Sequence, residues 1–433
     1  MRKRLSGSAA ARISALAVAG SLAVSALAPV TVAAQDYEPP PSDIEATLEI
    51  QNWGNPEDID WFKGIADGFR EKYPNVTIED NFVPITTWAD YINTLVAQVA
   101  SGNAPDVINI AIEGVKFGVE KDMFLPLDDY LSSDPAGAEL LADVDQPLID
   151  ALADENGIYL IPWQWNSMLM HYNTKMFEEA GIPRPSDDWT WDDFLAIAQQ
   201  LTTGEGEDKV WGYCIQTFLF GITPWFFSNG TSHLNEDWTA PNLTDPKMIE
   251  SVSFIRSLID EHGVSPAFAG TDAYQLFPAS KCAMTGAGHW TVGPNAAAGF
   301  EDYDVLPWPQ KEQKATVFGS AGFGIHPSSQ NQDLAWEYVK ELTSQEASDS
   351  FARRGASNPA RRSSAQLDEW LAFPESAELF FDSIEYAIPI PSPRNQPEVE
   401  TIFMRHIGDI LAGNVEPEAG LLAAQQELEP TFE

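Results

Sequence analysis

An alternation of strand and helix patterns at the start of the chain constrains its fold more than any other feature. The segment ATLEIQNWG (46–54) alternates apolar and polar residues and stops at a glycine. A helical pattern follows, carries Trp61 and Phe69 on one face and ends before Pro74, and a second strand begins at Val76. This strand, helix, strand order is typical of a parallel sheet covered by helices. The pattern therefore predicts an α/β fold.

The alternation continues over the rest of the chain. The run DVINIAI (106–112) is rich in β-branched residues, as a buried parallel strand would be. Capping signals predict helices from TWDD (190–193) and from Asp333. Further strands are expected at 212–216, 282–285 and 321–325. At 433 residues the chain is too long for a single core, so two or three structural units are expected.

The N-terminus has the pattern of an export signal. Three basic residues, 2–4, precede an apolar run over 13–28, and small residues then lead to Val32-Ala33-Ala34. The apolar run is shorter than the roughly 20 residues that a membrane-spanning helix needs. We therefore expect residues 1–34 to be a signal peptide cleaved after Ala34. No cysteine lies near that site, so no lipid anchor is expected.

The charge balance excludes some classes of partner. The chain has 24 Lys and Arg against 65 Asp and Glu, a formal net charge of −41. Nucleic acid and anionic membrane surfaces are therefore not expected to bind. The acidic residues are spread along the chain, which indicates a solvated acidic surface suited to a salty medium.

Two cysteines, Cys214 and Cys282, are present. In an oxidising compartment they could form a disulfide, which would stabilise the fold by about 4 kcal/mol in the chain-entropy model. Two buried thiols are the alternative, and the sequence does not decide between them.

The sequence lacks the common catalytic motifs. It contains no G-x-S-x-G, H-E-x-x-H, Walker loop or paired C-x-x-C. The six histidines are dispersed, and His171, within a strand pattern, is interpreted as a core residue rather than a metal ligand. No cofactor is expected. Because so many acidic residues produce close carboxylate pairs by chance, a secreted glycoside hydrolase remains an alternative.

The 14 tryptophans are more than packing alone requires. Those on helix faces or at helix starts are expected to pack in the core: Trp61, Trp189, Trp191 and Trp336. Others lie in or just after strands, beside Gly, Asn or Pro: Trp53, Trp163, Trp165, Trp225, Trp290 and Trp308. Aromatic faces stack on sugar rings, and Asn, Gln, Asp and Glu hydrogen-bond hydroxyl groups. This combination favours the binding of neutral polyols.

Several segments, in order, resemble a known family. They are FREKYPNVTIE (69–79), LVAQVASGNAPDVINI (95–110), GIYLIPWQWNSMLMHYNTKMFEEAGI (157–182), DWTWDDF (188–194), KCAMTGAGHW (281–290), GSAGFGIHPSSQNQDLAWEYVKEL (319–342) and GASNPARR (355–362). Together they are similar to the extracellular solute-binding proteins of carbohydrate ABC importers, the group that includes maltose-binding protein.

The resemblance implies a two-lobe periplasmic-binding-protein fold, with a ligand cleft between the lobes and crossing hinge strands. Lobe one would comprise 35–165 plus 319–372, and lobe two 166–318 plus 373–433. The first crossing strand would leave lobe one near Pro162 and enter lobe two near Leu169.

The resemblance also implies which residues bind ligand. Trp163, Gln164, Trp165 and Asn166 would form the hinge and floor of the cleft, with Trp53, Asn55 and Glu113 contributed by lobe one. The remaining candidates are Gln216, Trp225, Trp290, Ser320 and Arg394. The chain departs from the maltose-binding pattern because no basic residue follows the first strand and Asn166 replaces the carboxylate of the crossing strand. The ligand therefore need not be a maltodextrin.

The function implied is capture of a neutral mono- or oligosaccharide by a monomeric periplasmic protein, which delivers it to a membrane permease and performs no chemistry. A non-sugar solute such as a polyamine or polyol is the alternative. The scarcity of Lys and Arg near the expected cleft argues against a sugar phosphate.

Overall fold

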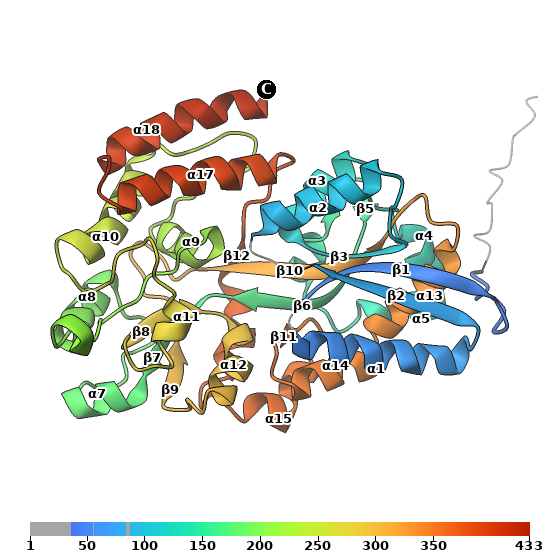
Figure 1. The fold of residues 1–433 in the computed structure, drawn as a ribbon, viewed down its shortest axis with the longest axis horizontal. Helices are drawn as coiled ribbons and strands as arrows, with labels where there is room; N and C mark the ends of the chain where they lie inside the picture. The colour runs from blue at the N-terminus through green and yellow to red at the C-terminus, as the bar shows by residue number, and fades with distance from the viewer. Residues whose placement is uncertain (1–35, 55, 84–86) are drawn as a thin grey trace, which may run out of the picture. The chain divides into compact units, whose positions relative to one another are not determined.

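The computed structural model describes residues 36–54, 56–83 and 87–433, so the predicted signal peptide and its cleavage site lie outside the described residues. A mixed seven-stranded sheet, which we call the large sheet, dominates one half of Figure 1. Its strand order is β11-β6-β10-β3-β1-β2, with β12 also paired to β10. The strands are β1 (Ala46–Trp53), β2 (Val76–Val83), β3 (Val107–Ala111), β6 (Ile161–Ser167), β10 (Thr316–Ile325), β11 (Asn358–Pro359) and β12 (Ala387–Pro389).

The large sheet is only partly parallel. Strand β1 pairs in parallel with β2 and β3, as the strand and helix alternation predicts. Strand β10 runs antiparallel to both β3 and β6. The expectation of wholly parallel sheets is therefore wrong, because β10 is parallel to β12 but enters the sheet antiparallel to β3 and β6.

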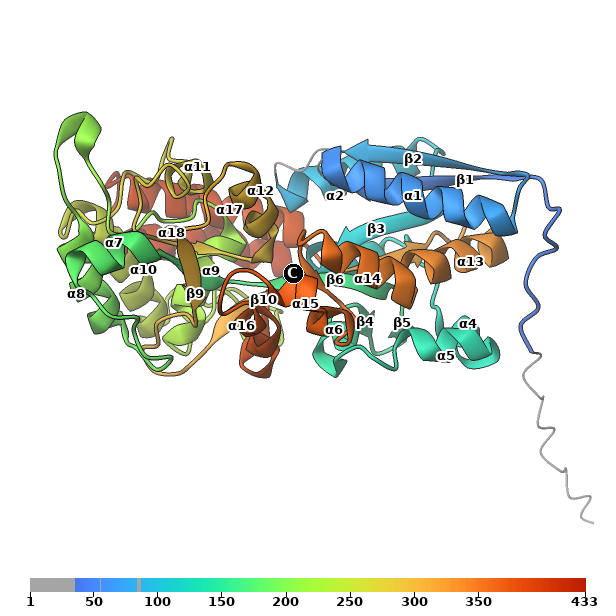
Figure 2. The same ribbon diagram turned by 90° about the horizontal axis from the view of Figure 1, so that it is seen from below.

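The large sheet separates two apolar cores. All five residues of β3 are buried, and they alternate: Val107 and Ala111 belong to one core, Ile108 and Ile110 to the other. The first core is covered by helices α1 (Pro56–Lys72), α13 (Gln332–Leu342) and α14 (Gln345–Arg353), which Figure 2 shows in front of the sheet. The second is covered by α2 (Trp88–Ala100) and α3 (Ile112–Glu120) on the opposite face (Figure 1).

A second, three-stranded sheet is wholly antiparallel. Its central strand, β7 (Leu169–Asn173), lies between β8 (Met284–Ala287) and β9 (Tyr303–Leu306). Only Met168 separates β6 of the large sheet from β7, so the chain passes directly from one sheet to the other. The strand expected at 212–216 is absent, and single bridges from Trp211 and Cys214 to the 282–285 segment replace it.

Helices and their aromatic side chains form the largest core, on one side of β7. The predicted capping box opens α8: the Thr190 hydroxyl accepts from the Asp193 amide, and the Asp193 carboxylate accepts from Thr190. The helices around this core are α7 (Thr174–Ala180), α8 (Trp191–Leu201), α9 (Leu219–Ser228), α10 (Pro246–Asp260), α17 (Gln396–Leu411) and α18 (Pro417–Leu428).

Shorter elements complete the fold. They are α4 (Asp128–Ser133), α5 (Pro135–Leu140), α6 (Gln146–Asp150), β4 (Ala153–Asp154), β5 (Gly157–Ile158), α11 (Ala273–Leu276), α12 (Val292–Ala297), α15 (Asp368–Leu371) and α16 (Glu378–Asp382). Within the described part of the chain, no helix combines the length and apolarity needed to cross a bilayer.

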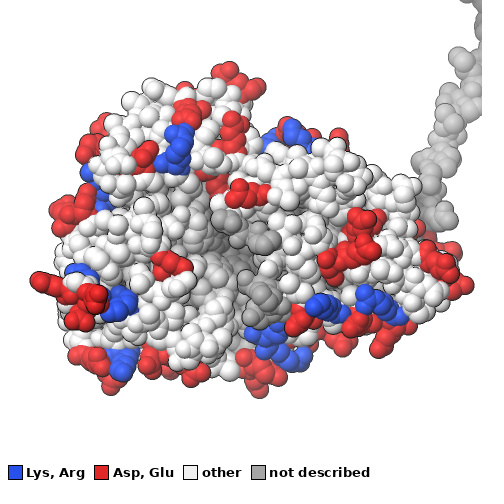
Figure 3. Space-filling view, viewed as in Figure 1, with Lys and Arg blue, Asp and Glu red and all other residues white. Residues whose placement is uncertain are grey.

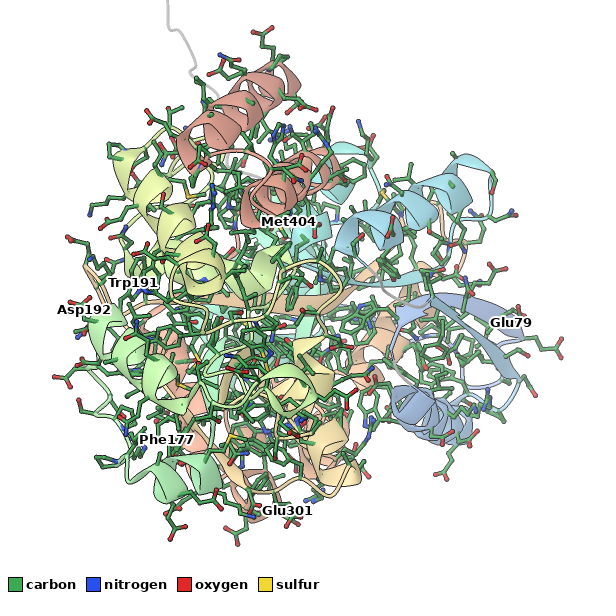
Figure 4. The ribbon with its side chains drawn as sticks, turned by 60° about the vertical axis from the view of Figure 1, so that its left-hand side comes forward. Glu79, Phe177, Trp191, Asp192, Glu301 and Met404 are labelled. Carbon is green, nitrogen blue, oxygen red and sulfur yellow. A yellow bond between two sulfur atoms is a disulfide. The ribbon has the colours of Figure 1, made fainter. Side chains whose placement is uncertain are left out.

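Cys214 and Cys282 form a disulfide, which resolves the open alternative in favour of pairing. Many acidic residues lie on the surface, as their spread along the sequence predicts: Figure 3 shows Asp and Glu scattered over the visible face with a few Lys and Arg among them. In Figure 4, Glu79, Asp192 and Glu301 lie at the periphery, whereas Trp191 beside Asp192 is buried.

Candidate functional site

A cavity of about 780 Å³ lies where the edge of the large sheet meets the helices around the second sheet. This volume is within the range of roughly 300–1,000 Å³ that is usual for small-molecule sites. Segments that are far apart in the sequence line it, from Trp53 at the end of β1 to Glu400 on α17.

Strands β6 and β10 supply the polar floor of the cavity. Gln164, Trp165 and Asn166 line it from β6, and Ser320 of β10 is paired with Trp165. The Asn166 amide donates a hydrogen bond of 2.5 Å to the Ser357 hydroxyl. Among the described residues, the Asn166 Oδ1, Ser320 Oγ and Trp165 Nε1 atoms are buried without a hydrogen-bond partner. Such atoms are costly to leave unpaired, so a ligand hydroxyl would find partners here.

Two tryptophans form one aromatic wall. Trp53 ends β1, and Trp88 begins α2 behind the Thr87 N-cap. Their ring centres are 5.2 Å apart and nearly perpendicular, at 85°. The Trp53 Nε1 is buried and lacks a partner in the described part of the chain. The wall therefore combines ring faces with an indole donor, which suits a sugar ring that carries hydroxyl groups.

Trp290 lines the cavity from the second sheet. It follows β8, and its ring lies 6.2 Å from the ring of Phe220, which also lines the cavity, and 6.3 Å from that of Tyr274. A Cβ atom at Gly288 would overlap the Trp290 ring, so only glycine allows this ring to fold back over the chain. The local sequence GAGHW thus fixes the direction of the indole.

An ion pair forms part of another wall. The Arg354 guanidinium, just after α14, lies 3.0 Å from the Asp58 carboxylate on α1, and both residues line the cavity. The Arg354 Nη1 is buried without a hydrogen-bond partner among the described residues. The pair is neutral as a whole and leaves one guanidinium donor for a ligand.

Helices α3 and α17 close the remaining end with two carboxyl groups and a carboxamide. Glu113 is in the first turn of α3, whereas Gln396 and Glu400 lie one turn apart on α17. Burial, with the charge of Glu400, raises the pKa of Glu113 to about 8. Burial also raises the pKa of Glu400 to about 7, with a contribution from Asp90. This end can both donate and accept hydrogen bonds near neutral pH.

Comparison with known proteins identifies the class of chain that carries this cavity. The family model of bacterial extracellular solute-binding proteins matches residues 53–349. This chain belongs to that family. A curated relative, a binding protein of Brucella abortus, is 22% identical over 380 residues, which cover 83% of this chain and 87% of the relative.

Solved structures share the fold of this solute-binding protein. A Listeria monocytogenes ABC substrate-binding protein in complex with cycloalternan matches with a TM-score of 0.81 and 22% identity, over 90% of this chain and 99% of that one. A Thermotoga lettingae ABC transporter solute-binding protein bound with alpha-D-tagatose matches with a TM-score of 0.79 and 21% identity, over 90% and 100%. The predicted two-lobe fold is thereby confirmed.

Seven of the predicted ligand-binding residues line the cavity: Trp53, Glu113, Gln164, Trp165, Asn166, Trp290 and Ser320. Their meeting in one cavity is consistent with the prediction, and their contact with a ligand stays a prediction. Asn55 lies outside the described residues.

Trp163 lies in the core beside the cavity. Its ring stacks on Trp61 with centres 5.5 Å apart, and its Nε1 donates to the Asn109 Oδ1 at 3.1 Å. Asn109 in turn donates to Asn52, which donates to Asp80. Trp163 therefore belongs to the apolar core next to the cavity, where it packs with Trp61, and it does not line the cavity itself.

Three further candidates also lie outside the cavity lining. Gln216 is buried and donates to the Thr285 hydroxyl at 2.8 Å and the Gly286 carbonyl at 2.7 Å, so it holds the start of β8 in place. Trp225 is fully buried on α9 among the rings of Trp191, Phe194 and Trp308. Helical periodicity turns Trp225 inward, a core position that the interpretation as a strand-end residue missed.

Arg394 lines a different hollow and forms ion pairs with Glu120 at 3.6 Å and Glu155 at 3.9 Å. Arg394 lies on the IPSPRNQP loop just before α17, and its side chain does not line the main cavity. The loop therefore does not bring Arg394 to the other candidate residues.

Sequence reasoning missed several lining residues: Asp58, Trp88, Phe218, Phe220, Arg354, Gln396 and Glu400. For two of these residues, the sequence contains a pattern that could have identified them. Gln396 and Glu400 are four residues apart at the start of a helix, where polar side chains on one face point the same way. The other residues are brought to the cavity by tertiary packing.

Proposed function

We propose that this solute-binding protein captures a neutral mono- or oligosaccharide outside the cytoplasmic membrane and delivers it to the permease of an ABC importer. The observation that carries the proposal is the cavity itself, in which aromatic faces and buried polar atoms that lack partners among the described residues face one space. Rings supply stacking and the polar atoms supply both donors and acceptors for hydroxyl groups. The relatives of similar fold hold cycloalternan and alpha-D-tagatose, which supports a carbohydrate ligand.

The proposed mechanism is closure of two lobes, 35–165 plus 319–372 and 166–318 plus 373–433, around the sugar. The direct passage from β6 to β7 at Met168 supports a first crossing at that point. Ligand contacts from both lobes would favour the closed state, and the permease would recognise that state. We propose that the protein acts as a periplasmic monomer after cleavage near Ala34 and catalyses no reaction.

A thermal-shift screen of the exported protein tests the proposal. Neutral sugars, sugar acids, polyols and polyamines would be added separately, because a ligand that binds only the folded state raises the melting temperature. A shift of several degrees with one sugar, absent with its epimers, would support sugar capture. A shift with polyamines alone would replace it with the non-sugar alternative. Release of product from a bound oligosaccharide would contradict the absence of catalysis and restore the hydrolase alternative.

A further inference from the structure

The end of the cavity between α3 and α17 brings two carboxyl groups together, those of Glu113 and Glu400. Helix α17 contacts both α2 and α3 across this end (Figure 1). Glu113 on α3 is 6% exposed, and Glu400 on α17 is half-buried. One carboxyl oxygen of each, Oε2, is buried without a hydrogen-bond partner in the described part of the chain. Two carboxyl groups near each other in a place of low polarity repel when both are ionised.

Gln396 provides an independent sign that a ligand group belongs here. It lies one turn before Glu400 on the same face of α17, is completely buried, and lines the same cavity. Neither its Nε2 nor its Oε1 atom has a hydrogen-bond partner among the described residues. A buried carboxamide with both ends unpaired costs free energy unless another molecule supplies the partners.

The basic side chains around this end interact with groups other than Glu113 and Glu400. Lys116, the basic residue of α3, lies over the Trp238 ring at 4.0 Å, and Arg394 pairs with Glu120 and Glu155. Arg354 pairs with Asp58 on another wall, while Asp90 at the start of α2 adds further negative charge. Among the described residues, no Lys or Arg forms an ion pair with Glu113 or Glu400. When these two carboxyl groups are ionised, the described part of the protein therefore supplies no ion-pair partner for them.

A protonated amine fits this end better than a metal ion. No group of three or more His, Cys, Asp or Glu side chains that could hold a metal occurs among the described residues. An ammonium group has three donors, which match the oxygens of Glu113, Glu400 and Gln396. Trp88 lines the cavity from α2, and its ring face attracts cations.

We propose, resting on the proposed sugar-binding function, that Glu113, Glu400 and Gln396 form a subsite for a protonated amino group of the ligand. The protein would therefore prefer an amino sugar to the neutral sugar of the same skeleton. Neutral sugars use the aromatic walls and the floor, whereas the amine adds charge-assisted hydrogen bonds at the α3 and α17 end.

Matched pairs of sugars test this preference by calorimetry. The pairs are glucose and glucosamine, galactose and galactosamine, mannose and mannosamine, and cellobiose and the fully deacetylated glucosamine disaccharide, which differ only in hydroxyl or amino groups. We expect at least one amino sugar to bind about tenfold to a hundredfold more tightly than its partner. The ratio within a pair removes the contribution of the shared ring.

Variants assign the preference to the subsite. Glu400→Gln and the double change Glu113→Gln with Glu400→Gln keep the side-chain shape but remove the charge, and we expect the ratio to fall stepwise toward one. Glu398→Gln is the matched control, since it removes the same charge from an exposed position on α17 that does not line the cavity. The control should keep the ratio of the unaltered protein.

Proton release gives a second measurement on the unaltered protein. At pH 7 the Glu113 carboxyl, with its pKa of about 8, is largely protonated in the free protein. A bound ammonium group lowers the pKa of an adjacent carboxyl, so amino sugar binding should release a proton and neutral sugar binding should not. Calorimetry in two buffers of different ionisation enthalpy measures this release.

The outcomes separate this inference from the proposed function. A neutral sugar that binds as tightly as its amino partner in every pair overturns the amine subsite and leaves sugar capture standing. A preference that persists in the double glutamine variant, or binding without proton release, also overturns it. If no amino sugar in the panel binds, the subsite is rejected whether or not a neutral sugar binds.

Discussion

The Arg354 guanidinium and the Asp58 carboxylate lie 3.0 Å apart in the wall of the cavity, so the basic residue in the described lining is neutralised by a partner on α1. We expect this ion pair to disfavour anionic ligands, because a ligand carboxylate that accepted from the Arg354 Nη1 atom would lie near the negative charge of Asp58. We therefore expect the cavity to prefer ligands without a negative charge.

Asp58→Asn should convert this wall into an anion site. We expect glucuronate to bind about tenfold more tightly to the variant than to the unaltered protein, because one guanidinium charge is then uncompensated. Calorimetry at low and high salt would show a gain that falls as salt rises. Asp60→Asn is the control, because Asp60 is exposed on the same helix, pairs with Lys63 and does not line the cavity. Equal glucuronate affinities for both variants would contradict this role of Asp58.

Trp290→Ala should weaken sugar binding while the fold persists. The indole supplies a stacking face from the second sheet, and its loss is expected to lower affinity for the preferred sugar about tenfold, or roughly 1.4 kcal/mol. Trp211→Ala removes a half-buried indole that lies outside the cavity lining and serves as the control. Circular dichroism would check the fold and calorimetry the affinity; undiminished binding by Trp290→Ala would remove this residue from the site.

The sequence predicted the elements of the fold better than their directions. The alternation of apolar residues located β1, β2 and β3, and the TWDD signal located the start of α8. It could not show that β10 runs antiparallel, since strand direction depends on how distant segments pair rather than on local periodicity. The segment 212–216 has strand-like residues, yet this region forms only isolated bridges to the 282–285 segment, and its local pattern does not show how far that pairing extends.

The sequence could predict the cavity-lining residues that lie near the ends of strands. Trp53, Gln164 and Ser320 reach the cavity because the strands that carry them end or bend at its edge. Trp225 did not, because α9 turns it into a core of rings. Arg354 and Glu400 were missed because helices distant in sequence bring them in, and no local pattern distinguishes them from surface charges.

Loss of the disulfide should lower the stability of the fold and leave the ligand preference of the protein unchanged. Cys214 and Cys282 enclose a loop with a sequence separation of 68, and removing such a constraint is expected to cost roughly 4 kcal/mol in the chain-entropy model. The double change Cys214→Ser with Cys282→Ser should lower the urea midpoint of unfolding, and a reducing agent should do the same to the unaltered protein. The reducing agent should leave the double variant unchanged. Equal midpoints for all forms would show that the disulfide does not contribute to stability.

Buried histidines should make the protein sensitive to acid. Burial lowers the pKa of His171, His233 and His289 to about 3, and the charge of His289 contributes at His171. The unfolded chain titrates near the ordinary value of about 6.5, so between that pH and about 3 it binds protons that the folded chain does not. The free energy of unfolding should therefore fall as pH decreases through this range, with no contribution from these residues above it.

His233→Phe isolates one of these contributions. The His233 ring stacks on Phe403 with centres 5.2 Å apart, and a phenylalanine keeps an aromatic ring there while removing the titration. We expect the variant to lose less stability than the unaltered protein between pH 6.5 and pH 4, measured by urea unfolding at each pH. Phe403→Leu is the control: it should lower stability at every pH but keep the slope, because His233 remains buried. If His233→Phe leaves the slope unchanged, protonation of this histidine does not drive acid unfolding, since the linked protons must come from groups whose binding differs between the two states.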